Sequence, residues 1–378
     1  MEKVRSMMGE YSSFISDWST PGSPKGEYLM EYATSAFQIL KKGKSVTLTA
    51  NGPHEDTEPE QDMTLSFFSG GTGGEPERVT HSPSTLGFAV DGLIKQIGGG
   101  AVNSLCCLPL WHVGGWMQLE RAWRTGVKII FCDYRDIAFL KTSIASGFWI
   151  SLVPAQLVEI LKDERAVDLL KCVKGIFVGG ATISPRLTEK ARESELPVFP
   201  CYGSSETAGM VTLLHSRNFL DGIDGVGQCL SHAEIRVDPN TQVAEIQTSS
   251  LCLSRGNQKY KRGDWLRTPD YCTFSENGNY KILGRSDRVI NTGGEKVSAS
   301  QIEQILYSTG MVEQCLVTGI PDEKWGARLV VYISPENIDL EEVQVRTNGL
   351  LKGCMKPKEW HLCQKIPFSD LGKPIGPY

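Results

Sequence analysis

The chain has 378 residues, with 39 lysines and arginines against 44 aspartates and glutamates, so its formal net charge is -5. Hydrophobic residues make up 40% of the sequence and charged residues 22%, a balance typical of folded domains that excludes a disordered chain and a collagen-like repeat. An acidic chain without a run of lysine or arginine lacks the positive surface that nucleic-acid binding requires, so we expect no nucleic-acid partner.

The first twenty residues contain acidic side chains and no apolar run, and no apolar stretch of the sequence has the length of a membrane span. We therefore expect no integral membrane segment and a cytoplasmic location. The eleven cysteines include no CxxC pair that could anchor zinc, so we interpret them as buried reduced thiols.

Short apolar runs alternate with amphipathic stretches between about residues 64 and 202. The runs predict buried strands, and the stretches, where apolar residues recur at helical spacing, predict helices. This alternation favours a mainly parallel sheet covered by helices, with sites at the carboxyl ends of the strands. The predicted strands are Thr64–Phe68, Ser104–Leu108, Val127–Phe131, Phe148–Val153, Val173–Val178 and Pro197–Tyr202, and the predicted helices are Ser84–Ile97, Trp116–Arg124, Pro154–Leu161 and Ser184–Ser194.

After about residue 213 the apolar runs become shorter and are separated by turns of Gly, Pro, Asn and Asp, which predicts a β-rich subdomain made of short strands. A second change near Gly284-Arg285-Ser286-Asp287 marks a domain boundary, so we predict an α/β fold with a large domain at 1–285 and a small mobile α+β domain at 286–378. Ser300 and Glu303 predict a capping box for the first helix of the small domain. The remaining predicted elements are strands at Ala233–Val237, Val243–Thr248, Tyr280–Leu283, Cys315–Gly319, Leu329–Ile333 and Glu359–Gln364, and helices at Ser300–Ser308 and Leu340–Leu351.

A glycine-rich segment between the first predicted strand and the first predicted helix is the clearest functional motif. Four glycines let the backbone approach an anion and aim N–H groups at it, which suits phosphate binding. No Gly-Lys-Ser or Gly-Lys-Thr follows, so the segment is not a Walker A loop, and the glycines alone leave a flexible surface loop open as an alternative. The segment consists of Ser69, Gly70, Gly71, Thr72, Gly73 and Gly74.

Further motifs, each weak alone, follow in a characteristic order. Their order resembles the adenylate-forming superfamily of acyl- and aryl-CoA synthetases, from about residue 64 to Lys373. Within it, the stretches 108–115, 179–191 and 196–212 look most like the o-succinylbenzoate–CoA ligases. The motifs are Leu108-Pro109-Leu110-Trp111-His112, Val178-Gly179-Gly180-Ala181, Cys201-Tyr202-Gly203-Ser204-Ser205-Glu206-Thr207, Arg262-Gly263-Asp264-Trp265, Gly284-Arg285-Ser286-Asp287, Gly293-Gly294-Glu295 and Asp370-Leu371-Gly372-Lys373.

The resemblance implies an enzyme that joins a carboxylic acid to CoA in two steps. The acid attacks the α-phosphate of ATP to give an acyl-adenylate, and CoA then displaces AMP, so ATP, Mg²⁺ and CoA are implied as cofactors. A homodimer is among the expectations, and the oligomeric state stays open. Two alternatives remain: a ligase for another aryl or medium-chain acid, and a member that binds nucleotide without turnover.

The resemblance also implies a role for each motif. Lys373 would contact the α-phosphate, Glu206 would bind Mg²⁺, and His112 would line the acid site, although a histidine in this setting is as often a core residue. Asp287 would act as the hinge of the small domain. The nucleotide would be bound by Ser69, Gly70, Gly71, Thr72, Gly73, Gly74, Gly179, Gly180, Ala181, Tyr202, Gly203, Ser205, Asp264 and Arg285, and the CoA tunnel would be formed by Gly293 and Gly294.

Two departures from the family pattern concern the phosphate loop. The family loop continues Thr-Thr-Gly-x-Pro-Lys, whereas this chain has Gly73 for the second threonine and Glu77 for the lysine. A carboxylate beside a polyphosphate is unfavourable, and we expect Arg78, one position later, to compensate. The sequence after Lys373 also departs from the acidic and basic residues usual in the family.

Overall fold

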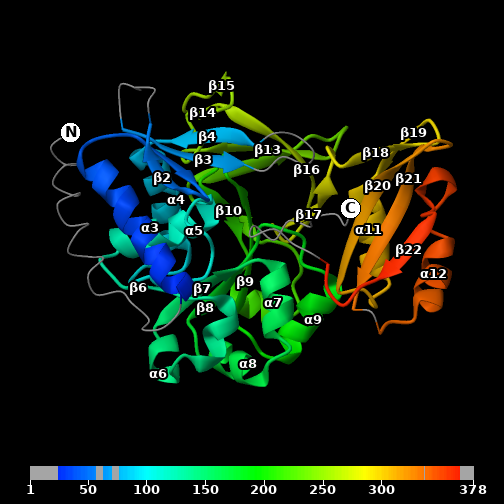
Figure 1. The fold of residues 1–378 in the computed structure, drawn as a ribbon, viewed down its shortest axis with the longest axis horizontal. Helices are drawn as coiled ribbons and strands as arrows, with labels where there is room; N and C mark the ends of the chain where they lie inside the picture. The colour runs from blue at the N-terminus through cyan, green and yellow to red at the C-terminus, as the bar shows by residue number, and fades with distance from the viewer. Residues whose placement is uncertain (1–23, 57–62, 70–75, 336, 367–378) are drawn as a thin grey trace.

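The computed structural model describes residues 24–56, 63–69, 76–335 and 337–366. Two lobes are visible in Figure 1: a large lobe on the left, ending with strand β17 (Tyr280–Arg285), and a small lobe on the right, starting with β18 (Val289–Thr292). The boundary predicted between residues 285 and 286 falls between these two strands. The mixed α/β architecture, with a large N-terminal part and a small C-terminal part, confirms the predicted fold class.

The main sheet of the large lobe has seven strands. Strands β5 to β9 are parallel to one another, whereas β10 pairs antiparallel with β9 and β11 pairs antiparallel with β10. Its parallel strands consist largely of buried apolar residues such as Ile150 and Ile176, as expected for a sheet covered on both faces. In spatial order the strands are β11 (Gln228–Cys229), β10 (Gly209–Leu213), β9 (Val198–Ser204), β8 (Gly175–Val178), β7 (Phe148–Leu152), β5 (Asn103–Cys106) and β6 (Ile129–Phe131).

Helices connect these strands, and proline and serine mark several of their starts. Ser184 accepts a hydrogen bond from the backbone N–H of Leu187, with Pro185 in the first turn. Ser82 makes a reciprocal capping box with Thr85. The helices are α4 (Pro83–Gln96), α5 (Val113–Arg124), η1 (Tyr134–Phe139), α6 (Thr142–Ala145), α7 (Pro154–Ile160), α8 (Glu164–Lys171), α9 (Pro185–Glu193) and α10 (Ser216–Leu220).

Two further sheets complete the large lobe. A six-stranded sheet has the order β15-β14-β4-β3-β1-β2, and helix α3 (Pro24–Lys41) packs against β1, β2 and β6. A four-stranded antiparallel sheet, β12-β13-β16-β17, forms the predicted β-rich subdomain. The strands are β1 (Val46–Thr49), β2 (Gly52–Glu55), β3 (Leu65–Ser69), β4 (Glu77–His81), β14 (Ser254–Arg255), β15 (Gln258–Lys259), β12 (Ala233–Val237), β13 (Val243–Thr248) and β16 (Trp265–Phe274).

The small lobe has its own hydrophobic core, which includes Ile302, Leu306 and Val331. The predicted cap at Ser300 is wrong: helix α11 begins at Ala299, and Ser298 is the N-cap. Ser300 instead accepts a hydrogen bond from the backbone N–H of Arg285 at 3.1 Å. The elements are β18, β19 (Glu295–Ser298), α11 (Ala299–Ser308), β20 (Gln314–Asp322), β21 (Gly326–Ser334), α12 (Leu340–Asn348), η2 (Gly353–Met355) and β22 (Glu359–Leu362).

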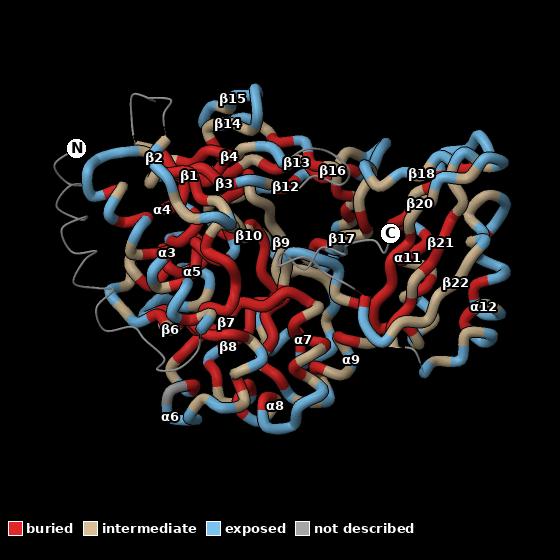
Figure 2. The backbone as a smooth tube through the Cα atoms, in the orientation of Figure 1, coloured by how far each residue is buried: buried red, intermediate tan, exposed pale blue. Residues whose placement is uncertain are grey.

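The strands at the centre of the main sheet are buried, as the red segments along β7 and β8 in Figure 2 show. An ion-pair contact joins the two lobes. The carboxylate of Glu313, directly before β20, pairs with Arg186 and Lys190 of α9. None of the eleven cysteines is in a disulfide; six of them are buried as predicted, and five are half-buried. Among the described residues, no helix combines the length and apolar character needed to cross a membrane.

Candidate active site

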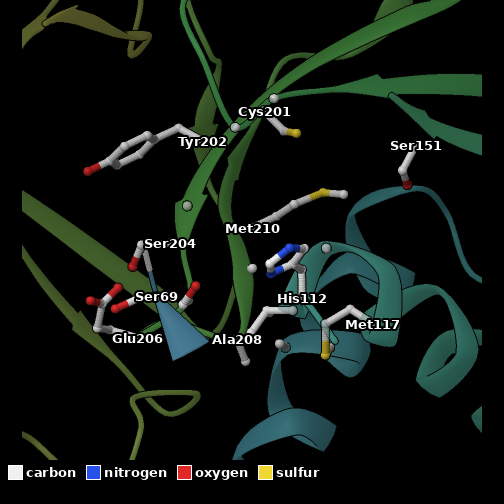
Figure 3. A pocket seen from close by; sticks show the side chains of 18 of the residues that line it. Ser69, His112, Met117, Ser151, Cys201, Tyr202, Ser204, Glu206, Ala208 and Met210 are labelled. Carbon is white, nitrogen blue, oxygen red and sulfur yellow. The ribbon is translucent and has the colours of Figure 1, made fainter. Parts of the chain in front are cut away.

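A cavity of about 320 Å³ lies at the carboxyl ends of β8 and β9, the position that a parallel sheet favours for a site. Helices α4 and α5 form one wall, and β16 and the end of β17 form another. In Figure 3, Ser69 and Glu206 lie together on one side of the cavity, and His112 and Met117 lie on the other. After the roles that the sequence predicts for Glu206 and His112, we call the first side, completed by Arg255, the phosphate end and the second, completed by Arg121 and Ser151, the acid end.

Most of the described residues that the sequence predicts for the site line this cavity, although some do not. Gly70 to Gly74, with Thr72 among them, and Lys373 lie outside the described residues. Ala181 is exposed and does not line the cavity, and Gly293 and Gly294 lie in the small lobe outside it. The predicted residues that line the cavity are Ser69, His112, Gly179, Gly180, Tyr202, Gly203, Ser205, Glu206, Arg285 and Asp287.

Glycines at the strand ends are required by close backbone contacts. A Cβ on Gly203 of β9 would lie 1.8 Å from the carbonyl oxygen of Gly209 in β10. A Cβ on Gly179 would lie 2.7 Å from Sγ of Cys201, and Gly180 has a φ of +82°. The two motifs found in the sequence therefore shape the floor of the cavity through their backbones.

The prediction for Asp264 is corrected by the structure. This residue is exposed outside the cavity, where its carboxylate accepts a hydrogen bond from the backbone N–H of Lys261 at 2.7 Å. Asp270 takes its place in the cavity wall. The hydroxyl of Tyr202 donates to the Asp270 carboxylate at 2.6 Å, and Arg285 lies 3.7 Å from the same carboxylate.

Asp270 is buried, which raises the pKa of its carboxyl, and the contacts with Tyr202 and Arg285 lower it in part. The signal in the sequence was its place on β16 directly across from Arg285 on β17. That pairing cannot be recognised before the register of the two strands is known. Asp270, Tyr202 and Arg285 thus form one polar corner of the cavity.

Glu206 follows β9 and is buried, with an ion pair of 3.2 Å to Arg255. Thr207 fixes this turn by accepting a hydrogen bond from the backbone N–H of Ser204 at 2.9 Å. The part of the chain that the structure describes holds no cluster of three or more His, Cys, Asp or Glu side chains suited to a metal. A single carboxylate still fits Mg²⁺, which takes its remaining ligands from phosphates and water.

Arg121 is the residue of the acid end that sequence reasoning missed. Its side chain, on the inner face of α5, is only 3% exposed and lies over the ring of Phe177. It donates to the carbonyl of Met117 at 3.0 Å and to the hydroxyl of Ser151 at 3.1 Å, while its Nη1 atom has no hydrogen-bond partner. No carboxylate within the described segments forms an ion pair with it.

Burial lowers the pKa of Arg121 to about 10, because removing the cation from water is costly. The guanidinium therefore stays protonated at neutral pH, without a counter-ion from the described part of the chain. Val113, Met117 and Arg121 are spaced four residues apart and therefore lie on one face of α5, and this spacing was the signal in the sequence. A charged residue on an otherwise apolar helix face indicates a site rather than a core.

His112 lines the cavity, but the tryptophans close to it in the sequence do not. His112 is the N-cap residue of α5 and lines the acid end. Trp111 packs against Tyr28 and Tyr32, and Trp116 is completely buried, so neither tryptophan reaches the cavity.

Comparison with known proteins agrees with this geometry. The family model of AMP-binding enzymes matches residues 15–257, and the model of the AMP-binding enzyme C-terminal domain matches residues 301–373. The chain belongs to the AMP-binding enzyme family. The family predicted from the order of the motifs is therefore confirmed.

Several relatives and solved structures are similar to this chain. The 2-succinylbenzoate–CoA ligase of Enterococcus faecalis is 25% identical over 374 residues, covering 93% of this chain and 76% of that protein. The same ligase of Listeria monocytogenes is 24% identical, covering 81% and 67%. The o-succinylbenzoate CoA synthetase MenE of Bacillus subtilis, solved with the acyl-adenylate OSB-AMP, has a TM-score of 0.67 at 22% identity, covering 82% and 67%. This structural likeness shows a shared fold.

The segment that joins the two lobes of this AMP-binding enzyme also touches the cavity. Arg285 donates through Nε to Asp287 at 2.8 Å, so the predicted hinge residue is tied to the polar corner. Gly293 and Gly294 form the turn between β18 and β19, where Gly293 donates to the carbonyl of Trp325 at 2.9 Å. The hinge and CoA-tunnel roles stay predictions.

Proposed function

We propose that this AMP-binding enzyme is an acid–CoA ligase that activates 2-succinylbenzoate with ATP. In the first step a carboxylate oxygen of the acid attacks the α-phosphorus of ATP, and pyrophosphate leaves. In the second step the CoA sulfur attacks the acyl carbon, AMP leaves with the electron pair of the broken C–O bond, and the thiol proton passes to solvent. ATP, Mg²⁺ and CoA are required, and a cytoplasmic location and a homodimer belong to the same proposal.

The observation that carries this choice of acid is the buried, unpaired guanidinium of Arg121. A buried cation without a counter-ion is strongly unfavourable, so the acid end is suited to a ligand that supplies a negative charge. The carboxylate that is activated cannot do so, because it must reach the α-phosphate. The acid must therefore carry a second carboxylate, and 2-succinylbenzoate, the substrate in the names of the relatives, has two.

Packing around Arg121 suits an aromatic dicarboxylate. Met117, Met210 and His112 line the acid end and offer an apolar surface for a ring. Arg121 can bind a ring carboxylate through its unpartnered Nη1 atom. A medium-chain monocarboxylic acid would leave the cation unpaired, so this alternative is disfavoured.

The nucleotide would occupy the other side of the cavity. Tyr202 would lie against the adenine, and Asp270 and Arg285 would bind the ribose hydroxyls, with Asp270 in the role predicted for Asp264. Bound Mg²⁺ would neutralise phosphate charge, and Glu206 would hold it. Lys373 and the loop at 70–74, outside the described residues, would contact the α-phosphate and the β- and γ-phosphates.

A pyrophosphate-release assay over a panel of acids tests the proposal. Pyrophosphate should form only when ATP, Mg²⁺ and 2-succinylbenzoate are all present, and mass spectrometry should find the CoA thioester after CoA is added. Faster release with a monocarboxylic acid of similar size would contradict the proposed substrate.

A second candidate function is nucleotide binding without turnover. It is favoured by Glu77, which places a carboxylate near the phosphate end, and by the ion pair that holds Glu206. Calorimetry that shows ATP binding, together with no acid-dependent pyrophosphate release for any acid of the panel, would support this candidate over the ligase.

A further inference from the structure

Arg255 lies at the phosphate end because of a short strand contact between distant segments. Strand β14 pairs antiparallel with β4, so that Arg255 stands across from Val79 and beside Glu77. The Nε atom of Arg255 donates to the Glu77 carboxylate at 2.6 Å, and Nη1 lies 3.2 Å from the Glu206 carboxylate. One guanidinium thus joins the residue that departs from the family pattern to the predicted magnesium ligand.

Arg78 does not supply the compensating charge that the sequence predicts. It alternates with Glu77 along β4, so the two side chains point to opposite faces of the sheet. Arg78 forms its ion pair with Asp56, which follows β2, and does not line the cavity. The expected compensation by Arg78 is therefore wrong.

The other arginines that line the cavity contact residues other than Glu206. Four arginines and no lysine line it among the described residues. Arg121 belongs to the acid end, Arg285 pairs with Asp287, and Arg267 contacts Glu245. Arg255 is the arginine of this lining that contacts Glu206.

We propose that Arg255 binds the β- and γ-phosphates of ATP in place of the lysine that the family carries at position 77, and that Glu77 positions its guanidinium. This assignment rests on the proposed ligase function. A guanidinium has five N–H donors, more than its two ion pairs use, so Arg255 can bind a phosphate while Glu77 still holds Nε. Its contact with Glu206 would be exchanged for the polyphosphate, which frees that carboxylate for Mg²⁺.

Titration calorimetry of the full chain with three probes tests the assignment: MgATP, magnesium pyrophosphate and AMP. Arg255→Gln should weaken MgATP and pyrophosphate binding by about 10- to 100-fold, the loss expected for a charge-assisted hydrogen bond, and change AMP binding by less than about twofold. Arg346→Gln removes a surface arginine paired with Glu342 on α12 and should change none of the three. Arg255→Lys, which keeps the charge, should retain part of the MgATP affinity.

A double variant separates phosphate binding from a structural role. Glu77→Lys combined with Arg255→Gln moves the cation from position 255 to position 77, where the family has it, and should restore most of the lost MgATP affinity. Equal weakening of AMP and MgATP by Arg255→Gln, no weakening at all, or no rescue by the second substitution would overturn the assignment. If the unmodified protein binds no ATP, the ligase proposal fails as well, whereas a wild-type protein that binds ATP equally well after Arg255→Gln refutes this inference alone.

Discussion

An arginine lies at each end of the cavity, and the two arginines differ in whether they have a counter-ion. Arg121 at the acid end is 3% exposed and has no carboxylate partner among the residues described, while Arg255 at the phosphate end lies between two carboxylates. An unpaired buried cation is a preformed receptor for an anion, whereas a paired one must exchange a partner when its ligand arrives. Under the proposed function, we therefore expect the acid end to determine which substrate binds and the phosphate end to rearrange when ATP binds.

The largest expected effect is on the acid end. Arg121→Met should lower kcat/KM for 2-succinylbenzoate by about 10²–10⁴-fold, because the ring carboxylate would be buried without a partner at a cost of about 3–5 kcal/mol. Initial rates of pyrophosphate release measure the loss. Binding of AMP, followed by calorimetry, should stay unchanged. A variant with wild-type kcat/KM would show that Arg121 does not contact the acid.

The next prediction compares two aspartates that lie close together in the sequence, one in the cavity wall and one outside it. Asp270→Asn should raise the Kd of AMP roughly tenfold, because a charge-assisted hydrogen bond to the ribose is lost. The matched control, Asp264→Asn, changes an exposed carboxylate and should leave the Kd unaltered. Calorimetry with AMP decides between them, and a larger effect at 264 would restore the sequence-based prediction.

Protonation should affect stability through His81, whose ring contacts the backbone carbonyl of Ser205 at 2.8 Å beside Glu206. Burial lowers the pKa of His81 from 6.5 to about 4, so the folded state resists the proton that the unfolded state accepts below pH 6.5. The stability held by the neutral ring is complete above pH 6.5 and is lost as the pH falls toward 4. Between pH 8 and pH 5 the loss is about 2 kcal/mol.

Urea unfolding at pH 8 and pH 5 measures this contribution. The quantity compared is the change in the free energy of unfolding between the two pH values, in the wild type and in His81→Gln. The variant lacks this titration, so its change should be less destabilising by about 2 kcal/mol. Equal changes in the two proteins would mean that His81 titrates normally.

The last expected effect is on stability and has the opposite sign from the first. Arg121→Met removes an unpaired buried charge, so the ligand-free variant should be more stable than the wild type by about 1–2 kcal/mol. Urea unfolding without ligand measures the difference. A less stable variant would indicate that the hydrogen bonds of Arg121 to Met117 and Ser151 outweigh the cost of the buried charge.

Sequence reasoning located the parts of the site that are continuous in the chain. The parallel strands β7, β8 and β9 are apolar runs, and the motifs at Gly179-Gly180 and Tyr202–Glu206 follow two of them directly. The short strands β1, β2 and β14 were not predicted, because runs of two to four residues carry little periodicity. Strand β14 joins its sheet only by pairing with β4, which is distant in the chain.

The three residues that sequence reasoning missed share one physical cause. Arg121 is recognised by what surrounds it after folding, and Asp270 by its register with Arg285. Arg255 meets Glu77 across 178 positions of the chain. Such contacts are a property of the folded cavity, so the sequence led instead to Arg78, the cation next to Glu77, and to Asp264, through its motif.

The central claim, that Arg121 receives a second carboxylate, is tested most directly by removing that carboxylate from the substrate. 3-Benzoylpropionate has the chain and ring of 2-succinylbenzoate without the ring carboxylate. With equal amounts of both acids, ATP and CoA, the wild type should form the 2-succinylbenzoyl thioester at least about 100-fold faster, and Arg121→Met should abolish most of this preference. Equal rates for the two acids in the wild type, or a preference that Arg121→Met leaves intact, would contradict the account.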